Sequence, residues 1–176
     1  MLLKKFTLKD LIYISLLAAI ATITKIPLKM ASKLFASTFG LPGGIINGMY
    51  YMFWLIAAYG IVGKRGTGIL FCIIQAGLSI YIFSMPSIKV ITFIPPGLAV
   101  DLLNVIINCK KDTKVFMALG GAVANVAGTL TMSILVMKVP LIGLIMASMI
   151  ASISGGIGGY CAYIVVKNLK IYQLQS

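Results

Sequence analysis

Polar side chains recur at helical spacing inside long apolar runs, and these are the residues that could do chemistry. Asn47, Tyr50, Tyr51 and Trp54 lie three, four and seven positions apart, so one helix face presents an amide, two phenols and an indole. A polar group held inside hydrocarbon is costly and is therefore a candidate for a functional site. The set contains no nucleophile with an adjacent base, so it indicates binding and not catalysis.

Four further pairs of polar residues lie three or four positions apart in later apolar runs: Gln75 with Ser79, Asp101 with Asn104, Asn125 with Thr129, and Ser148 with Ser152. Thr129, Ser148 and Ser152 are more typical of helix packing, because Ser and Thr bond their own helix backbone in lipid. The amides suit interhelical hydrogen bonds and ligand contacts equally well. The tyrosines could also belong to an aromatic belt at the membrane interface.

Asp101 differs from the others because it is the only carboxylate within a predicted span, and no Lys or Arg lies within a turn or two of it. Its charge requires a cationic ligand, a protonated state or a polar pocket. We expect Asp101 to line a site in the outer half of the membrane and to give a charge-assisted hydrogen bond to a ligand. Replacing it with Asn would then leave the unliganded protein at least as stable.

The residue types that are missing narrow the chemistry further. The chain has no histidine and no glutamate, which excludes zinc hydrolase motifs, Ser-His-Asp triads and paired-carboxylate sites that need them. No GxxxxGK(S/T) loop occurs, and the glycine-rich stretch 63–68 predicts a tight cytoplasmic turn. The three cysteines lack metal-site spacing. We therefore expect a binder or conduit with no cofactor, and not an enzyme.

The elements that must position these residues are transmembrane helices. Hydrophobic residues make up 60% of the 176 residues, charged residues 10%, and the mean hydropathy is +1.07. Such values are typical of a chain whose solvent is lipid. At about 20 apolar residues per crossing, we predict one all-α domain over residues 1–176, with about six spans at 8–26, 41–62, 67–85, 90–109, 114–137 and 140–167.

The charge pattern predicts the orientation of this bundle. Fifteen Lys and Arg oppose three Asp, and the formal net charge is +12. With the N-terminus inside, ten cations fall on the cytoplasmic side and five outside, so both ends are predicted to be cytoplasmic. The cations at span ends indicate topology and lipid headgroups and not a nucleic acid partner. The segment from Lys25 to Phe39 is expected to be an outer loop that covers the site.

Small residues indicate where helices approach closely. Two stripes, Gly120 to Gly128 and Ala151 to Gly159, are expected to pack the bundle itself. A third small face on the first span is a candidate docking surface for another membrane protein, or packs internally; it comprises Ser15, Ala18, Ala19 and Thr22.

Two stretches of the chain support a resemblance to a known family. They are 39–66, with Phe39-Gly40-Leu41-Pro42, Gly48 through Trp54 and Lys64-Arg65-Gly66, and 96–101, Pro-Gly-Leu-Ala-Val-Asp. With the six spans, they resemble the substrate-binding S component of an energy-coupling factor (ECF) vitamin transporter. Within that class the chain is most similar to the YkoE-type component for thiamine or its hydroxymethylpyrimidine precursor, over about two thirds of its length.

The resemblance implies a multi-pass protein of the prokaryotic plasma membrane. Its implied partners are a membrane coupling protein, two cytoplasmic ATPase subunits and a vitamin-like ligand. It also implies a site in which Trp54, Tyr50 and Tyr51 stack on a flat heteroaromatic ring while other groups meet its polar edge: Asn47, Gln75, Asn125 and Asp101. The segment 29–39 would close the site.

The chain departs from this pattern where acidic residues are expected near the second and third spans, with Gln75 standing in place of one. Another small vitamin or a metal complex is the alternative ligand. A dedicated metal site is disfavoured, because histidine is absent and the ten methionines are not clustered. A structural or regulatory membrane protein without a ligand is the alternative from another class.

Overall fold

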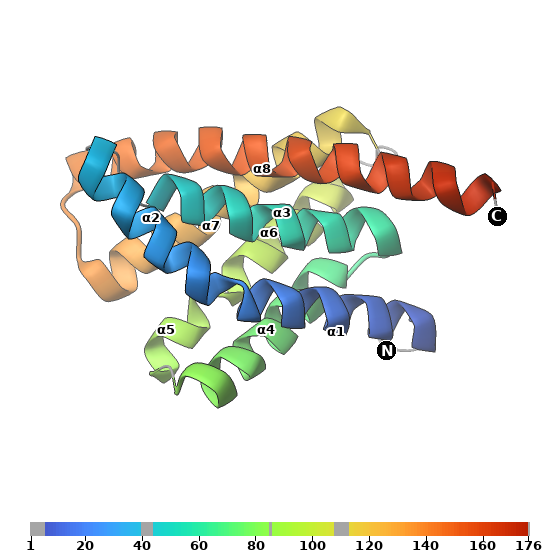
Figure 1. Ribbon diagram of the computed structural model, residues 1–176. Helices are drawn as coiled ribbons and strands as arrows, with labels where there is room; N and C mark the ends of the chain where they lie inside the picture. The colour runs from blue at the N-terminus through green and yellow to red at the C-terminus, as the bar shows by residue number, and fades with distance from the viewer. Residues whose placement is uncertain (1–5, 40–43, 85, 108–112, 176) are drawn as a thin grey trace.

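The computed structural model describes residues 6–39, 44–84, 86–107 and 113–175, and all of its regular elements are helical. In chain order they are α1 (Leu8–Ile23), α2 (Lys25–Phe39), α3 (Gly44–Val62), α4 (Thr67–Phe83), α5 (Ser87–Ile91), α6 (Ile94–Ile107), α7 (Lys114–Met132), a π-helical turn η2 (Ser133–Met137) and α8 (Leu141–Gln175). The all-α prediction is confirmed (Figure 1).

The helices have the length and surface of a membrane bundle. Among the described residues, four stretches are long and apolar enough to cross a membrane, and two shorter apolar helices complete the set of about six: Leu8–Ser32, Ile88–Ile107, Lys114–Met137 and Leu141–Lys170, with Ile46–Val62 and Thr67–Phe83. Large apolar side chains such as Leu102, Ile106, Ile142 and Ile153 are mostly exposed, while Gln75 is fully buried. This arrangement suits lipid as the solvent. The chain is a multi-pass membrane protein.

One predicted loop is a helix. The segment expected to be an outer loop forms α2, which begins directly after Thr24. Pro27 lies in the first turn of α2, where a helix does not need the missing N–H, so the proline does not break it. The side chains of 35–39, and those of Lys29 and Lys33, lie outside the described residues. The structure describes the expected cover over residues 29–39 by its backbone, which is helical.

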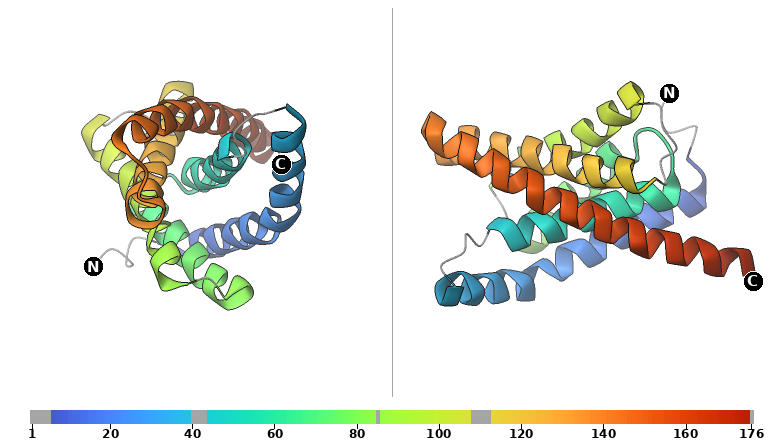
Figure 2. Two further views of the ribbon diagram at one scale, coloured as in Figure 1. Left: turned by 90° about the vertical axis from the view of Figure 1, so that its left-hand side faces the viewer. Right: turned by 90° about the horizontal axis from the view of Figure 1, so that it is seen from above.

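The two termini lie at one end of the bundle, and α2 runs along one side of the bundle at the other end (Figures 1 and 2). We call the end that carries the termini the inner end, and the end at α2 the outer end. An even number of spans puts both termini on one side, as predicted. Their assignment to the cytoplasm rests on the distribution of cations and stays a prediction.

Three helices touch through their backbones. A Cβ placed on Gly158 of α8 would lie 2.2 Å from the Met49 carbonyl oxygen of α3, and one on Gly159 would lie 2.1 Å from the Met117 oxygen of α7. Gly121 and Gly155 meet in the same way, with 2.2 Å from a Cβ on Gly121 to the Gly155 oxygen. Only glycine fits such contacts. The prediction that the last helix packs within the bundle through small residues is confirmed.

Candidate functional site

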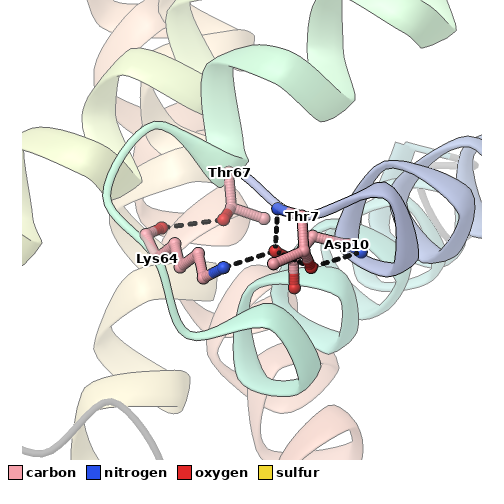
Figure 3. A network of polar contacts seen from close by, with 4 residues as sticks. All are labelled: Thr7, Asp10, Lys64 and Thr67. Carbon is pink, nitrogen blue, oxygen red and sulfur yellow. Dashed lines mark hydrogen bonds and ion pairs between the residues drawn. The ribbon is translucent and has the colours of Figure 1, made fainter. Parts of the chain in front are cut away.

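The turn between α3 and α4 organises the inner end of the bundle. Gly63 and Gly66 adopt φ angles of 63° and 91°, in the left-handed region that favours glycine. The Thr67 hydroxyl donates to the Lys64 carbonyl oxygen over 2.7 Å. The Lys64 ammonium also pairs with Asp10, which accepts from the Thr7 backbone nitrogen over 2.7 Å at the start of α1 (Figure 3). This ion pair ties the turn to α1.

Asp101 holds the same turn from α6. Its Oδ1 accepts from the Gly66 backbone nitrogen over 2.7 Å, and its Oδ2 accepts from the Ile69 nitrogen over 2.9 Å. The first N–H groups of a helix lack partners within it, so a carboxylate is well placed there. Near this contact the backbones of α4 and α6 approach closely, since a Cβ on Gly68 would lie 2.7 Å from the Gly97 carbonyl oxygen.

Two expectations for Asp101 are corrected by this geometry. The carboxylate lies at the inner end, beside the turn at which a Cβ on Gly66 would lie 3.8 Å from the ring of Phe6, so with the termini inside, as predicted, it does not lie in the outer half of the membrane. Its charge also needs no ligand, because the backbone N–H groups of α4 satisfy it. Of the three possibilities raised by the sequence, the polar surrounding is the one found, and the protein itself supplies it.

A second group of polar contacts fixes α2 on α3 at the outer end. The Thr24 hydroxyl contacts both the Ile20 carbonyl oxygen and the Tyr50 hydroxyl. Because the Thr24 proton is directed to the carbonyl oxygen, Tyr50 is the donor in the second contact. Asn47 Nδ2 donates to Ser32 Oγ over 3.3 Å. Two of the predicted site residues therefore hold α2 at one side of the outer end.

Tyr51 of α3 lies where α2, α4 and the turn before α6 come together. Its hydroxyl lies 3.7 Å from Cys72 Sγ on α4. The Lys25 ammonium of α2 lies 5.8 Å from the centroid of the Tyr51 ring and 4.4 Å from that of Phe93, just before α6. The two rings are themselves 5.9 Å apart. These are cation–π distances, so Lys25 is held over an aromatic pair.

Along α3 from Tyr51, and along α4 from its contact Cys72, lie buried polar atoms that have no hydrogen-bond partner. Gln75 and Ser79 are both 0% exposed, and neither the two polar atoms of the Gln75 amide nor Ser79 Oγ makes a hydrogen bond. Trp54 Nε1 is also buried and unpartnered. Gln75 and Ser79 share a face of α4 with Cys72, and Trp54 follows Tyr51 by one turn of α3. We call these residues the outer polar cluster: Lys25, Tyr51, Trp54, Cys72, Gln75 and Ser79.

Leaving such atoms unpaired costs stability, at about 1–3 kcal/mol for each buried group. Most buried polar groups in folded proteins have a partner, so a concentration of exceptions calls for an explanation. Trp54 also contacts two rings edge to face, with centroids 6.0 Å away for Tyr50 and 5.1 Å away for Phe53. The cluster combines aromatic surface with unused donors and acceptors, which is the composition of a small-molecule site.

Asn125 does not belong to this cluster. Its Nδ2 donates to the Ala151 carbonyl oxygen over 2.9 Å and to Ser154 Oγ over 2.8 Å, both on α8. The two amide hydrogens are thereby used. A Cβ on Gly48 of α3 would lie 2.6 Å from the same nitrogen, so Asn125 sits where three helices meet. Of the two roles left open by the sequence, the structure shows the interhelical one.

Comparison with protein families now adds to this geometry. Residues 9–127, from the start of α1 into α7, match the family described as ABC-type cobalt transport system, permease component. The chain belongs to this family. As a permease component it is a membrane part of an ABC-type transport system, which works with ATPase and membrane partner components. Comparisons with curated proteins and with solved structures found no match.

Of the four residues expected to form a docking face on α1, two are buried inside the bundle and two are at least partly exposed. Ala18 and Thr22 are 0% exposed, and the Thr22 hydroxyl donates to the Ala18 carbonyl oxygen over 2.7 Å. These two residues face the bundle, which is the internal packing that the sequence left open as the alternative. Ser15 is exposed and Ala19 is half-buried. A docking role remains a prediction for Ser15 and Ala19 alone.

Three members of the outer polar cluster were not singled out as site residues from the sequence. Lys25 was interpreted as a topology signal at the end of a span, Cys72 was considered only among cysteines that lack metal-site spacing, and Ser79 was paired with Gln75 without being assigned to the site. The spacing of Cys72, Gln75 and Ser79 on one helix face was visible in the sequence, and it could have placed Cys72. Nothing in the sequence could have placed Lys25 over Tyr51, because that contact depends on the bend between α1 and α2.

Proposed function

We propose that this permease component is the substrate-binding S component of an ECF-type ABC transporter. Its outer polar cluster would capture a small flat heteroaromatic vitamin or precursor, thiamine or hydroxymethylpyrimidine. The observation that carries the proposal is Gln75, a fully buried amide with neither polar atom hydrogen-bonded. A ligand with paired donor and acceptor atoms on a ring edge would satisfy both atoms of the amide at once.

Each residue of the cluster has a role in this proposal. Tyr51 and Trp54 offer ring faces and edges to a planar ligand. Gln75 forms hydrogen bonds to the polar edge of the ligand, and Ser79 and Trp54 Nε1 add one hydrogen bond each. Tyr50 and Asn47 act indirectly, because they hold α2 beside the outer end, where the ligand would enter. Asp101 and Asn125 position helices and make no ligand contact.

The partners of an S component would be a membrane coupling protein and two cytoplasmic ATPase subunits. The outward face of α1 supports a place for the coupling protein, since Ser15 is exposed there together with apolar residues that include Ile12, at 54%, and Leu16, at 56%. A small residue beside such apolar groups permits close helix contact.

Cobalt is the second candidate, because the family description names it. A bare divalent cobalt ion prefers imidazole, thiolate or carboxylate ligands. The chain contains no histidine and no glutamate, and the part that the structure describes contains no group of three or more His, Cys, Asp or Glu that could hold a metal ion. Within this second candidate, an organic complex of the metal therefore fits better than the free ion.

The test is ligand-dependent stability of the purified chain in detergent. Thermal unfolding is recorded with thiamine, hydroxymethylpyrimidine, cobalt(II) chloride and cobalamin, and binding is followed by the fluorescence of Trp54, the single tryptophan. A ligand at 100 times its Kd stabilises by about 2.7 kcal/mol. We expect a ring compound to do this for the natural chain and to lose the effect in Gln75→Leu. Stabilisation by a cobalt species alone would favour the second candidate, and no response to any compound would favour a structural protein.

A further inference from the structure

We propose that Asp101 acts as a two-position latch for the turn between α3 and α4. In the position that the structure shows, its carboxylate holds the first turn of α4 closed. In the second position it accepts hydrogen bonds from the Tyr59 hydroxyl and the Asn104 amide while the turn opens. This inference concerns the inner end of the bundle, goes beyond the proposed function and does not depend on it.

The two donors of the second position are buried and unused. Tyr59 is 1% exposed and Asn104 is 2% exposed. Within the described residues, neither the Tyr59 hydroxyl nor Asn104 Nδ2 has a hydrogen-bond partner. Burying such groups unpaired is costly, and most buried polar groups in folded proteins are paired. Two unpaired donors beside one carboxylate therefore call for a use in another state of the protein.

Both donors lie close to Asp101. Asn104 follows Asp101 by three positions on α6, so the two side chains share a face of that helix. Tyr59, in the last turn of α3, interacts electrostatically with Asp101 and lies near Asn104 as well. Its carbonyl oxygen accepts from the Gly63 nitrogen over 2.8 Å, so the same residue is tied to the start of the turn.

The carboxylate has the capacity for a second set of hydrogen bonds. An ionised Asp can accept about four, and the bonds from Gly66 and Ile69 leave part of that capacity open. Asp101 is only 8% exposed, so opening of the turn would otherwise leave a buried charge without a partner, which is strongly unfavourable. A phenol and an amide N–H that take over the charge remove most of this cost.

The turn itself is built to move once Asp101 lets it go. Gly63 and Gly66 have φ angles of 63° and 91°, a region that glycine enters and leaves without strain. The other side-chain anchor of the turn is the ion pair between Lys64 and Asp10, which is partly exposed and therefore contributes little. Asp101 is thus the buried anchor, and transfer of its hydrogen bonds would free this segment without unfolding the helices beside it.

The experiment measures hydrogen exchange of the full chain in detergent, resolved to the amides of residues 66–69, which include the two donors to Asp101. The variants are Tyr59→Phe and Asn104→Leu, each of which removes one donor of the second position. Tyr81→Phe is the matched control, because it removes the same hydroxyl from an 89% exposed ring near the other end of α4. Exchange within α7 reports any change in the stability of the whole bundle.

We expect exchange at residues 66–69 to slow by about tenfold in Tyr59→Phe and in Asn104→Leu, because the open turn loses a hydrogen bond to a charged group. Tyr81→Phe should leave it unchanged. Tyr59→Phe should have no further effect in an Asp101→Asn background, where there is no carboxylate to transfer.

Faster exchange in Tyr59→Phe would show that the hydroxyl supports the closed turn, and would overturn the latch. Unchanged exchange in both single variants, or slowing of equal size within α7, would overturn it as well. These single variants decide the proposal even where Asp101→Asn does not fold, and none of these outcomes bears on ligand binding at the outer polar cluster.

Discussion

The backbone nitrogen of Ile69 donates a 2.9 Å hydrogen bond to Oδ2 of Asp101, which joins the first turn of α4 to the middle of α6. Together with the bond from Gly66, it makes the carboxylate a cap for a helix end. Asp101→Asn keeps the shape but replaces one acceptor oxygen by an NH₂ group that faces a donor. We expect the free energy of unfolding to fall by about 1.5–3 kcal/mol, the worth of hydrogen bonds to a charged group.

This prediction reverses the one made from the sequence, in which Asp101→Asn spared stability and weakened ligand binding. Chemical denaturation in detergent gives the change in free energy, and Trp54 fluorescence gives the affinity of the folded fraction. Asp10→Asn is the comparison, since its ion pair with Lys64 is partly exposed and should contribute about 1 kcal/mol or less. An Asp101→Asn protein of natural stability with weakened binding would restore the ligand role.

Gln75 and Asn125 are both buried amides, and the structure predicts opposite outcomes for the same substitution. Gln75→Leu removes two atoms that have no partner, so the unliganded protein should be as stable as the natural chain or more so. Asn125→Leu breaks the bonds to Ala151 and Ser154 and should lower the free energy of unfolding by about 1–3 kcal/mol. Melting curves of the two variants without ligand decide this, and equal losses of stability would mean that Gln75 has a structural partner.

Gly158 and Gly77 provide a matched pair for the backbone contact between α3 and α8. A Cβ on Gly158 would lie 2.2 Å from the Met49 carbonyl oxygen, and backbone cannot give way as a side chain can. Gly158→Ala should destabilise the protein by about 1–3 kcal/mol or more. A Cβ on Gly77 of α4 meets nothing within 4 Å, so Gly77→Ala should stabilise by about 0.5–1 kcal/mol. Thermal unfolding in detergent checks both, and a tolerated Gly158→Ala would contradict the close approach.

Ala18 and Ala19 separate packing of the chain from docking of a partner. Leucine at position 18 has to enter a fully buried site on α1, so Ala18→Leu should lower the melting temperature of the isolated chain. Ala19 is only half-buried, and Ala19→Leu should leave the isolated chain folded while it hinders close helix contact. Size-exclusion chromatography of the chain alone and co-purification with a coupling protein are the two readouts. Undiminished co-purification of Ala19→Leu would remove this face from the docking surface.

The apolar runs, and the Gly, Pro and Lys residues that separate them, were enough to predict the bundle, because each span needs only sufficient length and apolar character. The stretch 114–137 was predicted as one span, and α7 with η2 occupies it from end to end. The helix at Lys25–Phe39 was missed, since three lysines and a proline suggested a loop and no local signal showed that α2 would be held on α3. Tertiary contacts decided that segment, and sequence periodicity does not report them.

The candidate site was predictable only where its residues share a helix. The spacing of Tyr50, Tyr51 and Trp54 identified a face of α3 that does contribute to the cluster. Asp101 was placed at a ligand site because, of the three possibilities, a ligand contact was favoured over a polar pocket that the protein itself supplies. Its partners are backbone nitrogens 32 and 35 residues away, which no spacing rule reveals.

The backbone contacts at the glycines hold neighbouring helices so closely that they cannot slide past one another. α3, α7 and α8 are locked through Gly121, Gly158 and Gly159, and α4 is locked to α6 through Gly68 and Gly97. The outer polar cluster includes residues of both groups, with Trp54 on α3 and Gln75 on α4. A ligand that contacts Trp54 and Gln75 at once would hold α3 against α4, and would restrict the relative motion of these two helices.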